Sequence, residues 1–480
     1  MKATFYRYGF HVVIEPDVSG VLASGLSYKK RIVEGLVVSF RTVRCYDNTL
    51  LHEGRPSVCI PAGLTVRALR ILAERGIETE LTDRREFVLP NPDLSRLDVP
   101  DDAQIDMLAA IIDSDHGIVE APTGSGKSWI IRQICKIWPV NVLIVIPGKV
   151  GGELLRQTYL ELLRCFPPSE VGMVGKGNRD SGKRITVVMD RSLHHANTRD
   201  CRILLFDEVH CAAALETARA LAAIRNARRF GFSASPFGRS DHADMETVSL
   251  FGEVIYSVGY REIQRMGRVV PIELRWVNTD RILPRDLSLF KGEGPHDRLR
   301  VDRHLVWRNA ERNAAIAAAV NRVRDEVGRD AQVLIFTATV EHAVFLGKLL
   351  PDFVLVYGEM KNREKYERWG LIPPGAHPIG HDERTAYRED FRSGKLKLAI
   401  ATHIWGTGID FPSLQILVRA DAQASPIAST QIPGRVTRCS SGKEKGIVID
   451  FSDGFFSVLD DRARRRKSSY SSKGWTIIPS

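Results

Sequence analysis

The sequence is poor in cysteine and contains no long apolar run. Its seven cysteines among 480 residues are scattered, and no two of them form a CxxC pair. This spacing argues against a disulfide framework, a zinc ribbon or an iron–sulfur cluster, and it predicts reduced thiols. No apolar run approaches the roughly 20 residues that a membrane helix needs. The first residues lack an apolar stretch followed by a cleavage site, which argues against a secretory signal. We therefore expect a cytoplasmic protein without a membrane span.

Acidic residues are fewer than basic ones. Lysine and arginine number 68 and aspartate and glutamate 58, which gives a formal net charge of +10. A basic surplus suits a polyanionic partner, although charge alone is a weak argument. Hydrophobic residues make up 44% of the chain, an ordinary value for a globular protein. At about 150 residues per domain, the length suggests roughly three domains.

Two stretches of the chain alternate short apolar runs with helical patterns. The first series contains the runs 142–146, 185–189 and 203–206, and the second contains 333–336, 354–357, 398–401 and 416–418. This alternation predicts an α/β fold in which helices cover parallel sheets. We place one lobe at residues 101–275, a polar linker at 276–310 and a second lobe at 311–458.

The two ends of the chain differ from these lobes. Residues 1–100 combine short β-rich runs with one helical stretch at 65–75, which predicts a small N-terminal α+β module. The segment 459–480 contains the basic run 462–467. We expect it to be a basic C-terminal tail, either solvated or in contact with a nucleic acid.

A glycine-rich segment at residues 121–128 (APTGSGKS) predicts a phosphate-binding loop. It follows an apolar run and precedes a helical pattern, as such loops require. The glycines let backbone N–H groups turn toward a phosphate, and the helix N-terminus adds partial positive charge. Lys127 would reach the β- and γ-phosphates of ATP, and Ser128 would offer its hydroxyl to Mg²⁺. The strict pattern begins with glycine, whereas this sequence has Ala121. The predicted nucleotide-binding residues are Pro122, Thr123, Gly124, Ser125, Gly126, Lys127 and Ser128.

An acidic pair, Asp207 and Glu208, follows the strand-like run 203–206. Ligands of doubly wound sheets bind at the C-terminal ends of the strands. Asp207 could hold Mg²⁺, and Glu208 could polarise an attacking water. Such a pair is often only a solvated turn, but the phosphate loop upstream favours a catalytic interpretation.

The phosphate loop and the sequence 207–210 (DEVH) together resemble the DEAD/DEAH-type superfamily-two helicases. Further signatures of that family follow in the expected order. They are Gln104, Pro147 with Leu154 and Gln157, 233–236 (SASP), 335–337 (IFT), Thr402 with Gly408, Ile409, Asp410 and Pro412, and 431–438 (QIPGRVTR). The resemblance covers about residues 100–455. It implies two tandem RecA-like parallel-sheet lobes with ATP bound between them.

The resemblance also implies roles for individual residues. Gln104 would read the adenine, and Gly408 and Asp410 would complete the nucleotide site from the second lobe. Arg435 and Arg438 would face the γ-phosphate, and which of them acts as the arginine finger is left open. Residues that would couple hydrolysis to nucleic acid are His210, Ser233, Ser235 and Gln431. Residues that would contact nucleic acid are Ser192, Thr337 and Thr402, although each of these hydroxyls could instead cap a helix or close a turn.

Within the superfamily, the DEVH sequence and the small N-terminal module resemble UvsW-, XPB- and RecG-like DNA helicases, and a phage origin would fit. The segment 60–78 is similar to the N-terminal DNA-recognition module of UvsW-like and XPB-like enzymes, which implies that residues 1–100 form such a module. The sequence departs from the family pattern at several positions. The usual Ser-Ala-Thr reads Ser-Ala-Ser, Gly148 replaces a threonine, and Ile432 stands where arginine is common. The insertion 361–381 has no role that the sequence reveals.

These resemblances imply an ATP-dependent DNA helicase or translocase that remodels forked or branched DNA in recombination, repair or replication, for example by branch migration. Its partners would be forked, branched or duplex DNA, with single strands also possible. Its location would be the bacterial cytosol or a phage-infected cell. Two alternatives stay open. One is a DNA-dependent ATPase motor or recruitment module that does not separate strands, and the other is an RNA helicase.

Overall fold

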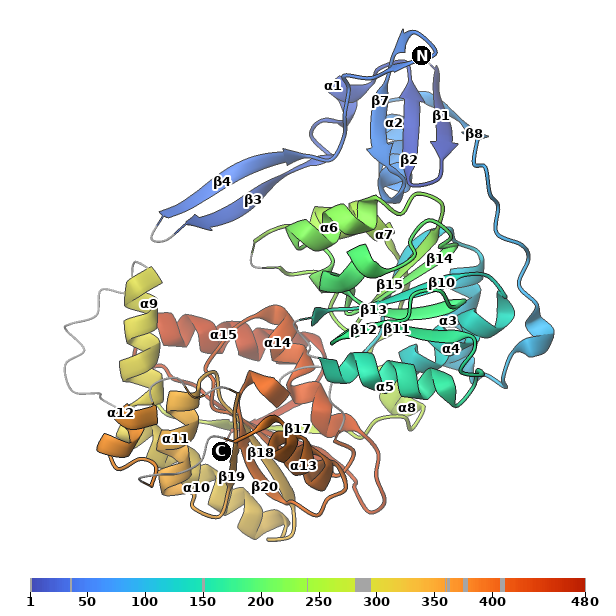
Figure 1. Cartoon of the computed structure of the whole chain (residues 1–480). Helices are drawn as coiled ribbons and strands as arrows, with labels where there is room; N and C mark the ends of the chain where they lie inside the picture. The colour runs from blue at the N-terminus through green and yellow to red at the C-terminus, as the bar shows by residue number, and fades with distance from the viewer. Residues whose placement is uncertain are drawn as a thin grey trace. The chain divides into compact units, whose positions relative to one another are not determined.

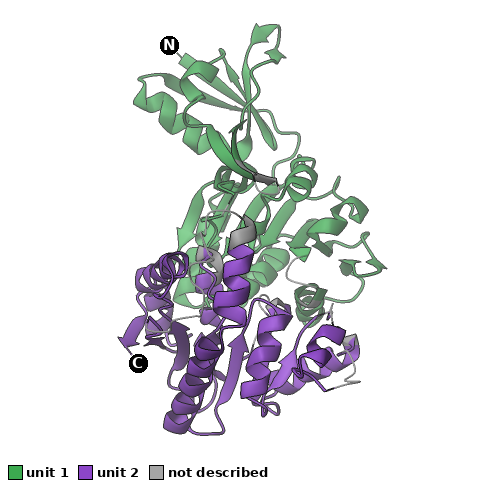
Figure 2. Ribbon diagram, turned by 90° about the vertical axis from the view of Figure 1, so that its left-hand side faces the viewer, with its two compact units in different colours: residues 1–258 green, residues 259–480 purple. Residues whose placement is uncertain are grey.

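The chain divides into two compact units, residues 1–258 and 259–480 (Figure 2). The structure is a computed structural model that describes residues 2–34, 37–148, 152–239, 241–280, 295–358, 360, 363–373, 379–405 and 411–479. Each unit has its own parallel or mostly parallel β-sheet with helices, which confirms the predicted α/β class. The two units are described separately below.

The first unit begins with a small α+β module, as predicted. Its four-stranded sheet has the order β7-β2-β1-β8. The strands are β1 (Lys2–Tyr8), β2 (His11–Glu15), β7 (Val58–Pro61) and β8 (Glu78–Asp83), and the helices are α1 (Ser19–Leu22) and α2 (Thr65–Glu74). Phe5, Ile14, Ile60 and Leu72 are buried in the core of this module. Alternating burial along β1 and β2 explains why these runs are β-rich and only half apolar.

A long hairpin leaves this module. It consists of β3 (Ser27–Glu34) and β4 (Val37–Arg44), which form a separate two-stranded sheet. Figure 1 shows the hairpin extending away from the four-stranded sheet. The short strands β5 (Leu51–His52) and β6 (Arg55–Pro56) form another two-stranded sheet.

The rest of the first unit is an eight-stranded sheet with the order β12-β11-β13-β10-β14-β15-β9-β16. All of its strand pairs are parallel except that between β11 and β12. The strands are β9 (His116–Glu120), β10 (Val142–Ile146), β11 (Val171–Gly175), β12 (Asn178–Arg179), β13 (Ile185–Met189), β14 (Ile203–Asp207), β15 (Arg228–Ser233) and β16 (Val254–Ser257). Every residue of β10 and β13 is buried, because helices cover both faces of such a sheet.

The helices of this sheet are α3 (Asp102–Ile112), α4 (Lys127–Ile137), α5 (Gly152–Leu163), α6 (Leu215–Ala222) and α7 (Asp244–Phe251). The N-terminal module touches the lobe closely at Gly63. A Cβ atom on Gly63 would lie 2.3 Å from the carbonyl oxygen of Val248 in α7. Only glycine permits this approach, so the module and the lobe belong to one unit.

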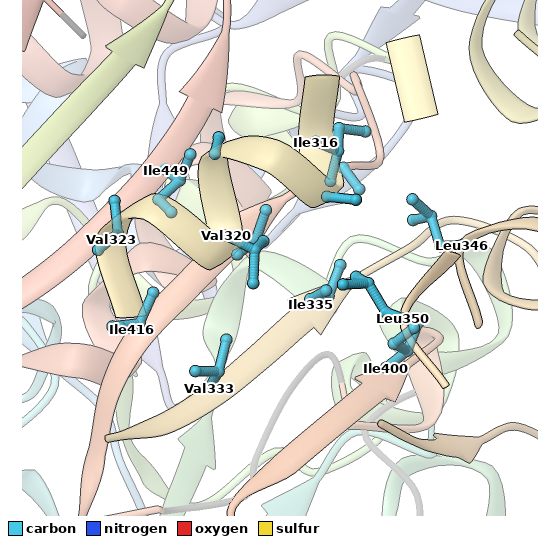
Figure 3. Close-up of a cluster of buried hydrophobic side chains, with 14 of the residues drawn as sticks. Ile316, Val320, Val323, Val333, Ile335, Leu346, Leu350, Ile400, Ile416 and Ile449 are labelled. Carbon is cyan, nitrogen blue, oxygen red and sulfur yellow. The ribbon is translucent and has the colours of Figure 1, made fainter. Parts of the chain in front are cut away.

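The second unit is built on a seven-stranded parallel sheet with the order β19-β20-β18-β21-β22-β17-β23. The strands are β17 (Ile272–Val277), β18 (Gln332–Phe336), β19 (Val354–Val356), β20 (Leu398–Ala401), β21 (Leu414–Arg419), β22 (Gly446–Phe451) and β23 (Thr476–Pro479). The helices are α8 (Tyr260–Arg265), α9 (Pro295–Val301), α10 (Ala310–Val327), α11 (Val340–Leu349), α12 (Arg363–Arg368), α13 (His381–Arg392), α14 (Pro426–Gln431) and α15 (Ser457–Ser472). Figure 3 shows Ile316 and Val320 of α10 near Val333 and Ile335 of β18 in its core.

The predicted domain boundaries differ from the structure at the end of the first lobe. We expected that lobe to extend to residue 275, but the units separate at 258/259. Strand β17 pairs with β22 and β23 of the second sheet. The segment 276–310 is not a simple linker either. Residues 281–294 lie outside the described residues, whereas Leu305 and Trp307 are buried beside Leu459.

The predicted basic C-terminal tail is wrong. Residues 459–480 continue α15 and supply β23, the edge strand of the second sheet. The Arg466 side chain is fully buried and donates to both carboxylate oxygens of Asp450 at 3.0 Å. Tyr470 on the same helix donates to Asp450 at 2.6 Å. The basic run therefore mixes exposed arginines with one that is part of the core.

The structure also bears on membrane crossing and on the state of the cysteines. No helix among the described residues is long and apolar enough to cross a bilayer. All seven cysteines lie in the described part of the chain, and none of them forms a disulfide. The insertion 361–381 contains α12 and the first residue of α13, while residues 361–362 and 374–378 lie outside the described residues.

Candidate functional site

Three adjacent strands bring the predicted site residues of the first lobe to one edge of its sheet. Strands β9, β15 and β14 are neighbours and run parallel. Glu120 at the end of β9 pairs with Ser233 at the end of β15, and Asp207 at the end of β14 pairs with Phe232. Because the C-terminal ends of parallel strands share an edge, the glycine loop and the acidic pair lie close together.

The glycine loop forms a turn that leads directly into α4. Gly124 and Gly126 have φ values of 92° and 96°, in the left-handed region that favours glycine. Gly126 is the N-cap of α4, which begins at Lys127. The Lys127 ammonium donates to the carbonyl oxygens of Ala121 at 2.7 Å and Pro122 at 3.0 Å. The lysine charge and the helix N-terminus are thus held at one place, an arrangement suited to an anion.

The side chains of Ser128 and Asp207 line one pocket. Gln157 and Glu161 of α5 and Arg132 of α4 also line it. Burial raises the pKa of Asp207 to about 7, and the charge of Glu208 acts in the same direction, while that of Lys127 opposes it. A buried carboxylate beside a hydroxyl offers the hard oxygen ligands that Mg²⁺ prefers. The described residues contain no cluster of three or more metal-binding side chains, and Mg²⁺ at nucleotide sites needs only one or two carboxylates.

Glu208 adopts an unusual backbone conformation. Its φ is 57°, in the left-handed region that non-glycine residues rarely occupy. Its carboxylate oxygen Oε2 lies 3.4 Å from His210 Nδ1 and accepts from the Ser233 hydroxyl at 3.4 Å. Strain of this kind is often found at functional sites. The conformation places the glutamate side chain beside the end of β15.

His210 and Ser233 connect the acidic pair to the SAS segment. His210 Nδ1 lies 3.2 Å from the Ser233 hydroxyl, and Ser235 donates its backbone N–H to that hydroxyl at 3.1 Å. The structure therefore brings three of the predicted coupling residues, His210, Ser233 and Ser235, close to the predicted catalytic residue Glu208. Their coupling role stays a prediction.

Gln104 lies near the start of α3 and is buried. Its backbone N–H donates to Asp101 Oδ1 at 3.0 Å, and its side-chain oxygen accepts from the Asp101 backbone N–H at 3.1 Å. This is a complete capping box. The structure therefore gives the side-chain oxygen of Gln104 a structural role, and adenine recognition by this residue stays a prediction.

Three predicted residues of the second unit, Gln431, Arg435 and Arg438, lie between β21 and β22. Gln431 ends α14, and Arg435 is buried in the short 3₁₀ segment Pro433–Thr437. Arg438 follows and forms a β-bridge with Val269. Gly408 and Asp410 lie outside the described residues. The functional roles of these residues stay predictions.

The three predicted nucleic-acid contacts have different exposures. Ser192 is partly exposed in the 3₁₀ segment Asp190–His195. Thr337 is fully buried, and its hydroxyl donates to the Thr339 carbonyl oxygen at 3.3 Å. Thr402 is also buried. For Thr337 the structure favours the alternative that its hydroxyl closes a turn.

One part of the site escaped the sequence analysis. Arg239 donates to the backbone carbonyl oxygen of His210 at 2.6 Å. It also donates to both carboxylate oxygens of Asp241, at 2.9 and 2.8 Å. No spacing or motif marks these two residues, because the contact joins a loop after β15 to the turn after β14.

Two family models match the chain. The model described as "Type III restriction enzyme, res subunit" matches residues 98–238, and "Helicase conserved C-terminal domain" matches residues 315–440. The first match contains the glycine loop and the acidic pair. The second contains Arg435 and Arg438.

Three curated proteins resemble the chain over most of its length. Putative helicase 22 of Sulfolobus islandicus filamentous virus is 23% identical, over 70% of this chain and 60% of that protein. The putative DNA 3'-5' helicase Rad25 of Halobacterium salinarum is 24% identical, over 78% and 58%. The DNA 3'-5' translocase XPB2 of Sulfurisphaera tokodaii is 24% identical, over 76% and 84%. The chain thus spans only about 60% of the length of the first two.

One solved structure with a TM-score above 0.5 shows a similar fold. A fragment of a putative HsdR subunit of a type I restriction enzyme from Vibrio vulnificus has a TM-score of 0.52 and 18% identity, over 75% of this chain and 65% of that one. The crystal structure of T4 UvsW has a TM-score of 0.40 and 16% identity, over 100% of this chain and 99% of that one.

Proposed function

Because this chain belongs to the superfamily-two helicases, we propose that it is an ATP-dependent DNA helicase or translocase that remodels forked or branched DNA. Its work would fall in recombination, repair or replication, for example in branch migration. The observation that carries the proposal is the convergence of Lys127, Ser128, Asp207 and Glu208 at one edge of the first sheet. The relatives named as DNA enzymes support DNA as the partner.

In this proposal the first unit binds and hydrolyses ATP. The N–H groups of the glycine loop and the Lys127 ammonium hold the phosphates. Ser128 and Asp207 would hold Mg²⁺, which would neutralise charge on the β- and γ-phosphate oxygens. Glu208 orients the attacking water and accepts its proton. The contacts of Glu208 with His210 and Ser233 would report the state of the nucleotide to the SAS segment.

The pKa of Asp207 predicts how Mg²⁺ binding depends on pH. Because burial raises this pKa to about 7, the side chain is protonated below pH 7, and a proton competes with Mg²⁺. We expect the Mg²⁺ concentration for half-maximal binding of an ATP analogue to rise about tenfold per pH unit below pH 7. Calorimetric titrations between about pH 5.5 and pH 8.5 measure it. Asp207→Asn should bind Mg²⁺ weakly and keep only the shallower pH dependence that protonation of the nucleotide's terminal phosphate causes, and an equal slope in both proteins would contradict the assignment.

The DNA substrate is tested by comparing nucleic acids as activators of ATP hydrolysis. We expect forked DNA to stimulate the ATPase of the whole chain at least tenfold and RNA of the same sequence to stimulate it less than twofold. Strand displacement on a labelled fork or a Holliday junction should require hydrolysable ATP. Equal or greater stimulation by RNA would favour an RNA helicase.

A second candidate function is a DNA-dependent ATPase motor that does not separate strands. The match of residues 98–238 to the restriction-enzyme model favours it, since such a subunit acts as part of a larger complex. Stimulation by DNA without displacement on any fork, duplex or junction would support this candidate over the first.

A further inference from the structure

The β3–β4 hairpin concentrates positive charge in its antiparallel ladder. Its two strands contain five basic residues, Lys29, Lys30, Arg31, Arg41 and Arg44, and one acidic residue, Glu34. Lys29, Arg41 and Arg44 are exposed. Among the side chains of the hairpin that the structure describes, only Tyr28 packs against the core of the module, and it does so from a partly buried position.

The register of the hairpin places like charges opposite each other. Lys30 pairs directly with Arg41, and like charges at such positions destabilise a ladder. The Asp241 carboxylate accepts from Nε and Nη2 of Arg239, and the charge of Lys30 also acts on it. One carboxylate thus faces several cations, so positive charge is left in surplus here, and a bound polyanion would relieve the repulsion.

An exposed aromatic ring accompanies these charges. The side chain of Phe40 is 59% exposed and lies opposite Arg31 in the register. Its ring meets His242 edge-on, with the centroids 6.2 Å apart. Basic residues interleaved with an accessible aromatic ring are typical of surfaces that bind unpaired nucleic-acid strands, where phosphates meet cations and bases stack on rings.

The hairpin is also connected to the candidate ATP site within the first unit. Arg31 donates its backbone N–H to the Asp241 carbonyl oxygen at 3.0 Å, and the Tyr28 hydroxyl donates to Glu246 at 3.3 Å. Asp241 holds Arg239, and Arg239 donates to the carbonyl oxygen of His210. His210 in turn contacts Glu208.

We propose that the β3–β4 hairpin binds the DNA on which the motor acts, with Lys29, Arg41 and Arg44 at phosphates and Phe40 against an unpaired base. The inference rests on the proposed function and deepens it. It assigns a strand-contacting element outside the two lobes. The Asp241–Arg239–His210 contacts connect that element with the turn that holds Glu208.

The test compares charge-matched triple variants of the whole chain. One combines Lys29→Ala, Arg41→Ala and Arg44→Ala. The control combines Lys2→Ala, Arg219→Ala and Arg329→Ala, which removes three other exposed charges. Fluorescence anisotropy with labelled forked DNA measures affinity over a range of salt concentrations. We expect the hairpin variant to bind at least tenfold more weakly. The slope of log affinity against log salt concentration should become shallower by about 2, since each phosphate that is no longer neutralised accounts for about 0.7. The control should stay within twofold of the unmodified protein.

Two single variants separate binding from folding. Phe40→Ala should weaken binding to forked DNA with single-stranded arms about 5- to 100-fold, the range for one stacked base, and change binding to blunt duplex less than twofold. Arg41→Ala removes the like-charge pair, so the thermal midpoint of this variant should not fall although its affinity for DNA does.

If the hairpin and control variants bind DNA equally well while the unmodified protein shows DNA-stimulated ATPase, the hairpin assignment is overturned and the proposed function stands. If the unmodified protein binds no DNA, both fail.

Discussion

Lys127→Ala and Glu208→Gln should each abolish DNA-stimulated ATP hydrolysis, but for different reasons. Lys127 supplies the charge at the glycine loop, so its removal should weaken nucleotide binding and lower the turnover number by about 10²–10³-fold or more. Glu208→Gln keeps the side-chain shape and removes the proton acceptor. It should lower turnover about 10²–10⁴-fold while ATP binding stays within about threefold. Steady-state ATPase assays and titration with a fluorescent ATP analogue distinguish the two results.

A matched control for these variants is Glu216→Gln. Glu216 of α6 has a side chain that is 87% exposed, and it lies outside the pocket that Ser128 and Asp207 line. The control should retain turnover within about threefold of the unmodified protein. Unchanged turnover in Lys127→Ala or in Glu208→Gln would refute the proposed ATPase site, whatever the affinity for ATP.

One of Arg435→Ala and Arg438→Ala should lower single-turnover hydrolysis by about 10³–10⁵-fold, the effect of losing an arginine finger. The finger stabilises charge that develops only in the transition state, so ATP binding should change little. The other variant should have a smaller effect. Single-turnover hydrolysis with saturating forked DNA measures both rates.

Burial of Arg435 requires a control for folding in that experiment. Arg435 is 8% exposed, so its variant could fail simply because the second unit is destabilised. Arg435→Lys keeps a charge but cannot reproduce a planar guanidinium, and it should restore the thermal midpoint without restoring hydrolysis if Arg435 is the finger. If both alanine variants hydrolyse ATP at the rate of the unmodified protein, neither arginine of the second unit takes part in hydrolysis.

The parts of this protein that could be predicted from sequence are those with a local signature. The strands at 142–146, 185–189 and 203–206 were predicted correctly because a parallel strand covered on both faces is a continuous apolar run. The glycine loop was recognisable because its φ values demand glycine at fixed positions before a helix. Adjacent strands then bring this loop and the acidic pair to one edge, as the fold class requires.

The errors arose where a local pattern has two meanings. The run 462–467 is strongly basic, a pattern that is typical of a solvated tail. In the structure Leu459, Ala463, Arg466 and Tyr470 form the buried face of α15. Arg466 can be buried only because Asp450 of β22 accepts its hydrogen bonds, and unpaired burial of that charge would be costly. The partner is 16 residues away in sequence, so no periodicity reveals it.

By itself, the sequence determined the α/β class, the position of the phosphate loop and the acidic pair, since each depends on residues next to one another. Tertiary structure alone decided that β17 joins the second sheet, that Arg239 meets the turn of His210 and that the hairpin lies against the loop at Asp241. The physical reason is the same in each case. These contacts depend on the strand order and on the path of loops in space. A hydrogen bond between distant segments requires no particular spacing of residues within either segment, so the sequence pattern does not reveal it.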